Sequence, residues 1–259
     1  MNNTFKYIGI SVFLIFSFYY TEKTNNILIS NNSLFNTIKE SSYIYEKDSI
    51  NAVLDGNYIV PGMNGLEVHL LDSYYNMKEF NKFNDKYLKY SYVAPVISVD
   101  NNKDKIINRG NSAKRCVSII LKDNNNIIDY SYSVGLDFSR LVDINTFDDF
   151  YNYEQVNNEI ENFNKLERRL NKKSNSNICV ITDLNKKLCQ NNDKYLVKPT
   201  LTLNNYNLKD IKKSIENGVI IYVDDNVKLI EYKLLLKQIN YQDLKIVRLS
   251  KLINEERDC

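Results

Sequence analysis

Residues 117–123 read VSIILKD, and this stretch decides the fold because it has the pattern of a buried strand. A short apolar run, β-branched at its start, ends in a charge pair and is followed by the polar residues 124–126. Such a run is typical of a strand in an α/β sheet whose two faces are both covered. In these folds functional side chains gather beyond the carboxyl ends of the strands, so the first candidates are Lys122 and Asp123.

Strand and helix patterns alternate through the rest of the chain up to residue 253. Residues 154–170 carry apolar side chains every three or four positions and predict one amphipathic helix. Further helices are predicted at residues 208–215 and 227–240, and strands at residues 177–182, 195–203, 219–223 and 244–249. This alternation predicts an α/β domain with a mostly parallel sheet.

Composition excludes several classes of function. The net charge of +2 gives no electrostatic reason to expect nucleic-acid binding. With 7 glycines in 259 residues, no glycine-rich phosphate loop is visible. His69 is the only histidine, so neither a histidine-rich zinc site nor a Ser-His-Asp triad near the predicted strands is expected.

The N-terminal residues 7–20 are uncharged and strongly apolar. The run is long for a signal-peptide core and short for a spanning helix of ~20 residues. We interpret residues 1–22 as an uncleaved signal anchor, with a cleaved signal peptide as the alternative. Both interpretations predict that the rest of the chain faces outside the cytoplasm. The signal anchor predicts a single-pass membrane protein, and the cleaved signal peptide predicts a secreted one. Residues 23–42 then predict a linker, and residues 43–114 a small β-rich module.

The four cysteines show no CxxC spacing and do not indicate a zinc site. A disulfide between Cys179 and Cys189 is one alternative, but spacing alone does not establish it. Buried or incidental free thiols are the simpler expectation for Cys116, Cys179, Cys189 and Cys259.

Residues 115–259 resemble the polysaccharide deacetylase (NodB-homology) domain, an irregular (β/α) barrel. Residues 117–123 are similar to its first barrel strand, which ends in Thr-Phe-Asp-Asp. Residues 217–225, NGVIIYVDD, are similar to the late strand Pro-Gly-Ser-Ile-Ile-Leu-Leu-His-Asp. Residues 227–253 resemble the helix, strand and short helix that close the domain. The resemblance implies a membrane-associated member of the type found in low-GC Gram-positive bacteria.

The resemblance also implies that most catalytic residues are replaced. Lys122 stands where the family has its general base, and only Asp123 matches a metal ligand. Val223 is taken as the replacement of the catalytic histidine, with Asp224 following it. The metal-binding His-Ser-x-x-x-His motif has no counterpart. The interval between Asp123 and Glu154 is predicted to be too short for the usual helix, strand and histidine loop.

Residues 146–149 spell Thr-Phe-Asp-Asp literally, but they do not follow an apolar strand pattern. Arg140 and Asp143 interrupt the residues before them, so a helix start capped by Thr146 is the preferred interpretation. A small acidic rim of Asp123, Asp224 and Asp225 is the second candidate site. Solvated loop carboxylates are the simpler explanation for these three residues.

We therefore expect a degenerate deacetylase-like protein that binds cell-wall glycan or a membrane-associated partner protein. No catalytic residue and no cofactor is expected. One alternative is an active carbohydrate N-deacetylase with a non-standard site near Asp123 and Asp224, and only that alternative requires a zinc-like divalent metal. The other alternative is a structural surface protein.

Overall fold

The computed structural model describes residues 3–150, 153–173, 177–205 and 207–259. The chain forms two compact units. Unit 1 comprises Met1–Asp48 and Gly65–Val93, and unit 2 comprises Ser49–Asn64 and Ala94–Cys259. This division differs from the predicted boundaries, because the module expected at residues 43–114 contributes strands to both units.

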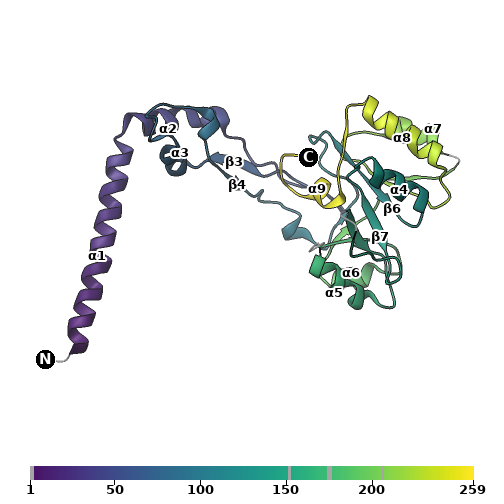
Figure 1. Ribbon diagram of the computed structural model, residues 1–259, viewed down its shortest axis with the longest axis horizontal. Coiled ribbons are helices and arrows are strands. Elements are labelled where there is room, and N and C mark those ends of the chain that lie inside the picture. The colour runs from purple at the N-terminus through teal and green to yellow at the C-terminus, as the bar shows by residue number, and fades with distance from the viewer. Residues whose placement is uncertain (1–2, 151–152, 174–176, 206) are drawn as a thin grey trace. The chain divides into compact units, whose positions relative to one another are not determined.

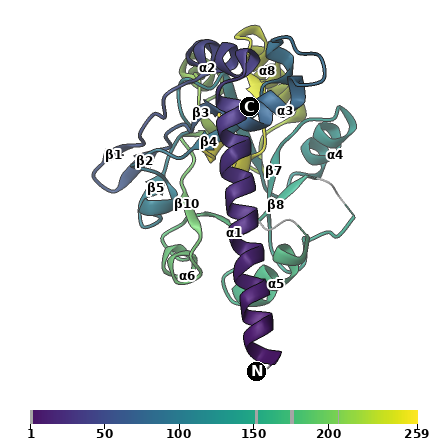
Figure 2. The same cartoon turned by 90° about the vertical axis from the view of Figure 1, so that its left-hand side faces the viewer.

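Unit 1 combines helices with a two-stranded antiparallel sheet (Figure 2). Its elements are α1 (Asn3–Ser30), α2 (Ser33–Tyr45), β3 (Gly65–Val68), α3 (Leu70–Met77), the 3-10 turn η1 (Asp85–Tyr87) and β4 (Tyr90–Val93). A small apolar core holds α2 and α3 against the sheet. It is built from the buried side chains of Ile29, Leu34, Ile38, Val68, Tyr74, Met77 and Leu88.

The linker predicted at residues 23–42 is helical, since α1 continues to Ser30 and α2 begins at Ser33. The side chain of Asn32 caps α2 by accepting a 2.9 Å hydrogen bond from the backbone N–H of Leu34. Within the described residues, no helix is both long enough and apolar enough to cross a membrane. The signal anchor predicted from residues 7–20 stays a prediction.

Unit 2 contains a larger sheet in which every strand pairing is parallel. Its spatial order is β11-β12-β6-β7-β8, and β13 also pairs with β6. The strands are β6 (Cys116–Leu121), β7 (Ser139–Val142), β8 (Glu154–Asn157), β11 (Leu201–Leu203), β12 (Ile220–Val223) and β13 (Lys245–Ile246).

A smaller sheet of unit 2 has the order β1-β2-β5-β10-β9. It is parallel except for the β1-β2 hairpin. Its strands are β1 (Val53–Asp55), β2 (Tyr58–Val60), β5 (Ile106–Ile107), β9 (Ile178–Val180) and β10 (Tyr195–Val197). The predicted α/β class with parallel strands is confirmed. In the described part of unit 2 the strands form two separate sheets, and the predicted irregular (β/α) barrel is not confirmed.

Helices cover the larger sheet on one face, where α4, α7 and α8 lie together (Figure 1). The other face shares an apolar core with the smaller sheet and α9. The helical elements of unit 2 are η2 (Asp100–Asn102), α4 (Asn125–Ser133), α5 (Phe163–Lys173), α6 (Lys186–Asn191), α7 (Leu208–Ser214), α8 (Leu229–Tyr241) and α9 (Leu249–Ile253). All six residues of β6 are buried, as a central strand requires.

Two predictions about the middle of the chain are wrong. Residues 154–170 do not form one helix, because Glu154–Asn157 pairs with β7 as a buried strand and α5 begins at Phe163. The interval between Asp123 and Glu154 does hold a helix and a strand, α4 and β7.

All four cysteines are paired, so the expectation of free thiols is wrong. Cys179 pairs with Cys189, and Cys116 pairs with Cys259 across 143 residues of sequence. The second bond ties the end of the chain to the first residue of β6. Sequence spacing gave no indication of this long-range pair.

Candidate functional site

Parallel strands bring the predicted rim residues to one edge of the larger sheet. Strand β12 pairs with β6 so that Val223 lies beside Leu121, and β7 pairs with the other side of β6. Lys122 directly follows β6, and Asp224 directly follows β12. They are therefore neighbours at the carboxyl edge of the sheet.

Alternation along the strands places the side chain of Val223 on the opposite face from those of Lys122 and Asp224. Side chains alternate along a strand. Leu121 and Val223 are buried in the core beneath the helices, whereas Ile120 packs between the two sheets. A gapless alignment of the quoted nine-residue family pattern with residues 217–225 sets the histidine of that pattern against Asp224, one residue after the predicted Val223.

The three rim aspartates come together, but backbone groups occupy two of their carboxylates. The backbone N–H of Asp123 donates a 3.3 Å hydrogen bond to the carboxylate of Asp225. The backbone N–H of Asp225 in turn donates a 2.8 Å hydrogen bond to the carboxylate of Asp224. The side-chain amide of Asn124 donates to the carbonyls of Asp225 and Val227, both at 2.9 Å. These hydrogen bonds hold the loop between β12 and α8 against the start of α4.

Tyr222 lies next to this acidic rim. Burial raises the pKa of its phenol to about 12, and the charges of Asp225, Asp224 and Asp123 act in the same direction. The phenol is therefore protonated at neutral pH. It can donate a hydrogen bond, but it cannot act as a phenolate base.

Asp143 is a further rim carboxylate, located just beyond β7. Burial by itself would raise the pKa of Asp143, but hydrogen bonds from Thr146 and Asn145 outweigh it. The nearby ammonium of Lys122 also helps to hold this pKa below its usual range. The carboxyl group of Asp143 thus favours the ionised form and serves as a turn acceptor.

The literal Thr-Phe-Asp-Asp sequence forms neither a metal site nor a helix start. Residues 144–146 form a turn, and the carboxylate of Asp143 accepts hydrogen bonds from the backbone N–H groups of Asn145 and Thr146 at 2.8 and 2.9 Å. The Thr146 hydroxyl accepts a 2.9 Å bond from the Asp143 N–H and so caps the turn, not a helix. The predicted helix at this position is wrong.

The rim does not fit the divalent metal of the deacetylase family. Zinc sites in proteins combine imidazole, thiolate and carboxylate ligands in a tetrahedral arrangement. Within the described ranges, no three His, Cys, Asp or Glu side chains are placed to hold a metal ion. His69 belongs to unit 1, where its Nδ1 lies 3.0 Å from the Asp72 carboxylate at the start of α3.

Two rim residues, Tyr222 and Asp143, were not predicted from the sequence. Tyr222 lies inside a strand pattern and Asp143 beyond a strand that was not predicted. Alternation along residues 220–224 could have found Tyr222, because it shares a face with Ile220 and Asp224. Asp143 had no comparable signal, since its strand contains the charged Arg140. Arg140 is buried, and its guanidinium donates a 2.8 Å hydrogen bond to the Tyr153 hydroxyl.

Sequence comparison finds one curated relative and no family profile. No protein-family model matches the chain. The uncharacterized protein YlxY of Bacillus subtilis (strain 168) is 31% identical over 99 residues, which are 38% of this chain. The matched part spans only 31% of that relative's length.

Solved structures show a likeness over most of the chain. BA3943, a CE4 family pseudoenzyme from Bacillus anthracis, matches 88% of this chain and 96% of its own chain, with a TM-score of 0.58 and 18% identity. A mutant of BA3943 with restored enzymatic activity matches with a TM-score of 0.57, over 88% of this chain and 100% of its own, also at 18% identity. CE4 is the carbohydrate esterase family of the polysaccharide deacetylases. The resemblance inferred from the sequence is thus confirmed as a likeness of fold: the chain has the fold of a CE4 family pseudoenzyme.

Proposed function

We propose that this chain is a catalytically silent, deacetylase-like protein that binds cell-wall glycan outside the cytoplasm. One observation carries the proposal. The rim presents an ammonium at Lys122 and a carboxyl at Asp224, in the positions where the family has its catalytic base and its imidazole acid. The fold is retained while the side chains needed for the reaction are replaced.

The chemistry of amide hydrolysis explains why these replacements matter. The reaction needs a divalent ion to polarise the carbonyl and to lower the pKa of a bound water. It also needs a group that protonates the leaving amine. Asp123 is the one residue that matches a family ligand, and a single carboxylate beside an ammonium does not hold zinc. No reaction step is therefore assigned to this rim.

The structural neighbours support a protein without catalytic activity. BA3943 is itself a pseudoenzyme, and a mutant of it has restored activity. In that protein the fold is compatible with catalysis once the side chains are suitable. We infer that the same holds for this chain: its fold is compatible with catalysis, and the identity of its rim residues accounts for the loss of activity.

A polar rim of this kind suits a carbohydrate ligand. Carboxylates accept hydrogen bonds from sugar hydroxyls, and side-chain amides both accept such bonds and donate them. Asp123, Asp224 and Asp225 lie together here, and the half-buried Tyr222 adds a phenol that stays protonated. We take the rim as the glycan-contacting surface on this basis.

The disulfides support a location outside the cytoplasm. Bonds between cysteines persist in oxidising compartments and are rare in the reducing cytosol. All four cysteines of this chain are paired. Labelling the native protein with a thiol reagent before and after reduction tests this part. Four cysteines blocked before reduction support it, and four reactive thiols in freshly lysed cells contradict it.

Acetate release tests whether the chain is silent. The protein is incubated with chitooligosaccharides or peptidoglycan in the presence of zinc, cobalt or manganese. We expect no release above that of the Asp123→Ala variant. Metal-dependent release that Asp123→Ala abolishes would overturn the proposal in favour of the active deacetylase.

Binding to cell-wall fragments tests the second half of the proposal. We expect peptidoglycan fragments to retain the protein, and the Asp224→Asn/Asp225→Asn double variant to be retained about tenfold less. Asp243→Asn is the matched control, because Asp243 precedes β13, which pairs with the opposite end of β6. Equal retention of all three proteins would show that the rim is not the glycan-contacting surface. No retention of any of them would contradict glycan binding and favour a structural role.

A further inference from the structure

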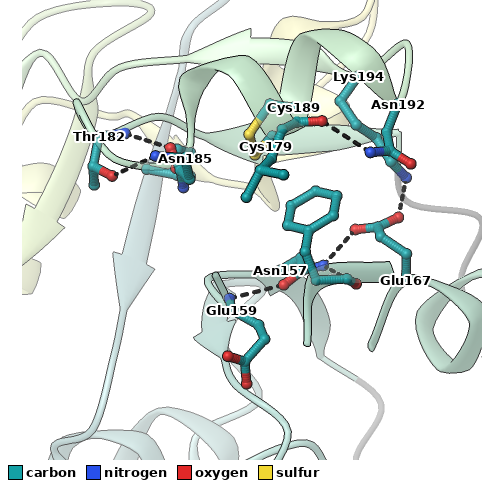
Figure 3. The surroundings of a disulfide bond; sticks show 12 residues. Asn157, Glu159, Glu167, Cys179, Thr182, Asn185, Cys189, Asn192 and Lys194 are labelled. Atoms are coloured by element: carbon teal, nitrogen blue, oxygen red, sulfur yellow. Dashed lines mark hydrogen bonds and ion pairs between the residues drawn. A yellow bond between two sulfur atoms is a disulfide. The ribbon is translucent and has the colours of Figure 1, made fainter. Parts of the chain in front are cut away.

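Unit 2 contains a buried group of three polar side chains that the proposed function does not use. Asn157 ends β8, Glu167 lies in α5, and Lys194 directly precedes β10. Only 1%, 5% and 4% of their respective surfaces are exposed. Charged residues are almost never this deeply buried without a specific partner. Figure 3 shows the three side chains meeting beside the Cys179–Cys189 disulfide.

The carboxylate of Glu167 connects the other two side chains. Its Oε2 forms an ion pair with Nζ of Lys194, while its Oε1 accepts a 2.9 Å hydrogen bond from Nδ2 of Asn157. An amine and a carboxamide thus share the two oxygens of one carboxylate.

The carboxamide of Asn157 is also polarised at its oxygen. The backbone N–H of Glu159 donates a 2.8 Å hydrogen bond to Oδ1, and Nδ2 donates a second bond of 3.2 Å to the carbonyl of Phe163. A donor at Oδ1 stabilises the negative charge that develops there when a nucleophile attacks Cγ. The surroundings are apolar, with buried Phe163, Cys179, Cys189 and Leu196 close by.

The geometry points to an intramolecular isopeptide bond between Lys194 and Asn157, formed autocatalytically with Glu167 as the proton-transfer group. An amine nucleophile, a polarised carboxamide and a carboxylate base in contact with both are the parts that such an acyl transfer needs. The placement of Glu167 supplies a proton acceptor for the amine and a proton donor for the leaving group. This modification site is independent of the glycan-binding rim.

The reaction balances without an external reagent. Glu167 takes one proton from the Lys194 ammonium, and the neutral amine attacks Cγ of Asn157. The Nζ–Cγ bond forms and the Cγ–Nδ2 bond breaks. Glu167 passes its proton to Nδ2 and takes a second proton from Nζ, so that ammonia leaves. The product is one secondary amide, and no group is oxidised or reduced.

The nearby disulfide helps to position the lysine. The backbone N–H of Lys194 donates a 3.2 Å hydrogen bond to the carbonyl of Cys189, which is bonded to Cys179 in β9. The disulfide therefore anchors the segment that presents Lys194 to Glu167. Together the two bonds would tie β8, β9 and the start of β10 covalently.

Mass spectrometry of the reduced full-length protein tests the proposal. We expect the chain to be lighter than its sequence by about 17 Da, the mass of one ammonia. A tryptic digest should contain a branched peptide joining Lys194 to Asn157, and trypsin should not cleave after Lys194. Separate, unmodified Lys194 and Asn157 peptides would overturn the proposal, whatever the behaviour of any variant.

Two variants separate catalysis by Glu167 from mere proximity. Glu167→Gln keeps the size of the side chain but removes its ability to accept a proton, so its peptides should be unlinked. Glu154→Gln is the matched control, because Glu154 is also buried but contacts Ser139 and the start of α9 instead. It should retain the branched peptide. A branched peptide in Glu167→Gln, or its loss in both variants, would contradict the assignment.

Discussion

The backbone N–H of Asp123 donates a 3.3 Å hydrogen bond to the carboxylate of Asp225 across the carboxyl edge of the larger sheet. Asp123 stands where the resembled family has a metal ligand. Here the backbone of Asp123 and the side chain of Asn124 hold the β12–α8 loop in place. The rim aspartates lie together, yet two of their carboxylates accept backbone hydrogen bonds instead of facing a common metal.

Asn124 is expected to be the main structural residue of the rim. Its side chain donates two 2.9 Å hydrogen bonds to carbonyls of the β12–α8 loop and accepts one of 3.3 Å from the Ile127 N–H at the start of α4. Asn124→Ala should lower the free energy of unfolding by about 1 to 2 kcal/mol. Urea denaturation should show a lower midpoint with an unchanged slope. The control Asn126→Ala, at an exposed position of α4, should not lower the midpoint, and equal losses in both variants would refute this role.

Gly218 should not tolerate alanine. Its φ is +82°, and a Cβ atom there would lie 2.4 Å from the carbonyl oxygen of Gly110. We expect Gly218→Ala to lower the free energy of unfolding by about 3 kcal/mol or more. Gly56 has a φ of +56°, but a Cβ atom there would meet nothing within 4 Å, so Gly56→Ala should cost only about 1 kcal/mol. Equal losses would show that the backbone collision at Gly218 does not matter.

The two disulfides should contribute unequally to stability. Cys116 and Cys259 are separated by 143 residues, and Cys179 and Cys189 by 10. Loop-closure entropy predicts losses in unfolding free energy of about 5 and about 2.7 kcal/mol for the two double Cys→Ala variants. Chemical denaturation of both variants measures the difference. A larger loss for the Cys179→Ala/Cys189→Ala variant would contradict this order.

Lys114 should make stability depend on pH in the alkaline range. Burial lowers its pKa to about 8, and Lys251 adds to this effect while Glu256 opposes it. In the unfolded chain the pKa returns to about 10.4. Between these values the unfolded chain binds more protons, so this group's contribution to stability increases as the pH rises.

The comparison with Lys114→Met isolates that effect. The wild-type free energy of unfolding, minus that of the variant, should increase from about pH 7.5 to about pH 10. The other titrating groups are common to both proteins and cancel in the difference. A constant or falling difference would contradict the lowered pKa of Lys114.

Much of unit 2 could be predicted from local patterns. The strand at residues 117–123 and the late strand at residues 219–223 were identified because their apolar runs are buried on both faces. The aspartates that follow them could therefore be placed at one edge of the sheet. The choice of Val223 was a one-residue shift in the motif match, since the gapless alignment of residues 217–225 sets the histidine against Asp224.

The remaining features depend on contacts between distant residues. Strand β7 was not predicted because it contains the charged Arg140, which is buried and contacts Tyr153 from the neighbouring segment of chain. Strand β8 was merged into a helix because Val156 happens to continue the spacing of α5. The pairing of Cys116 with Cys259 and the contacts among Asn157, Glu167 and Lys194 likewise have no local signal.

Zinc binding tests the central claim most directly, because a silent rim must lack the metal on which the family's reaction depends. The purified full-length protein is dialysed against excess zinc, and bound metal is measured per chain for the wild type and for Asp123→Ala. We expect no stoichiometric zinc in either protein. One zinc ion per wild-type chain, lost in Asp123→Ala, would contradict it.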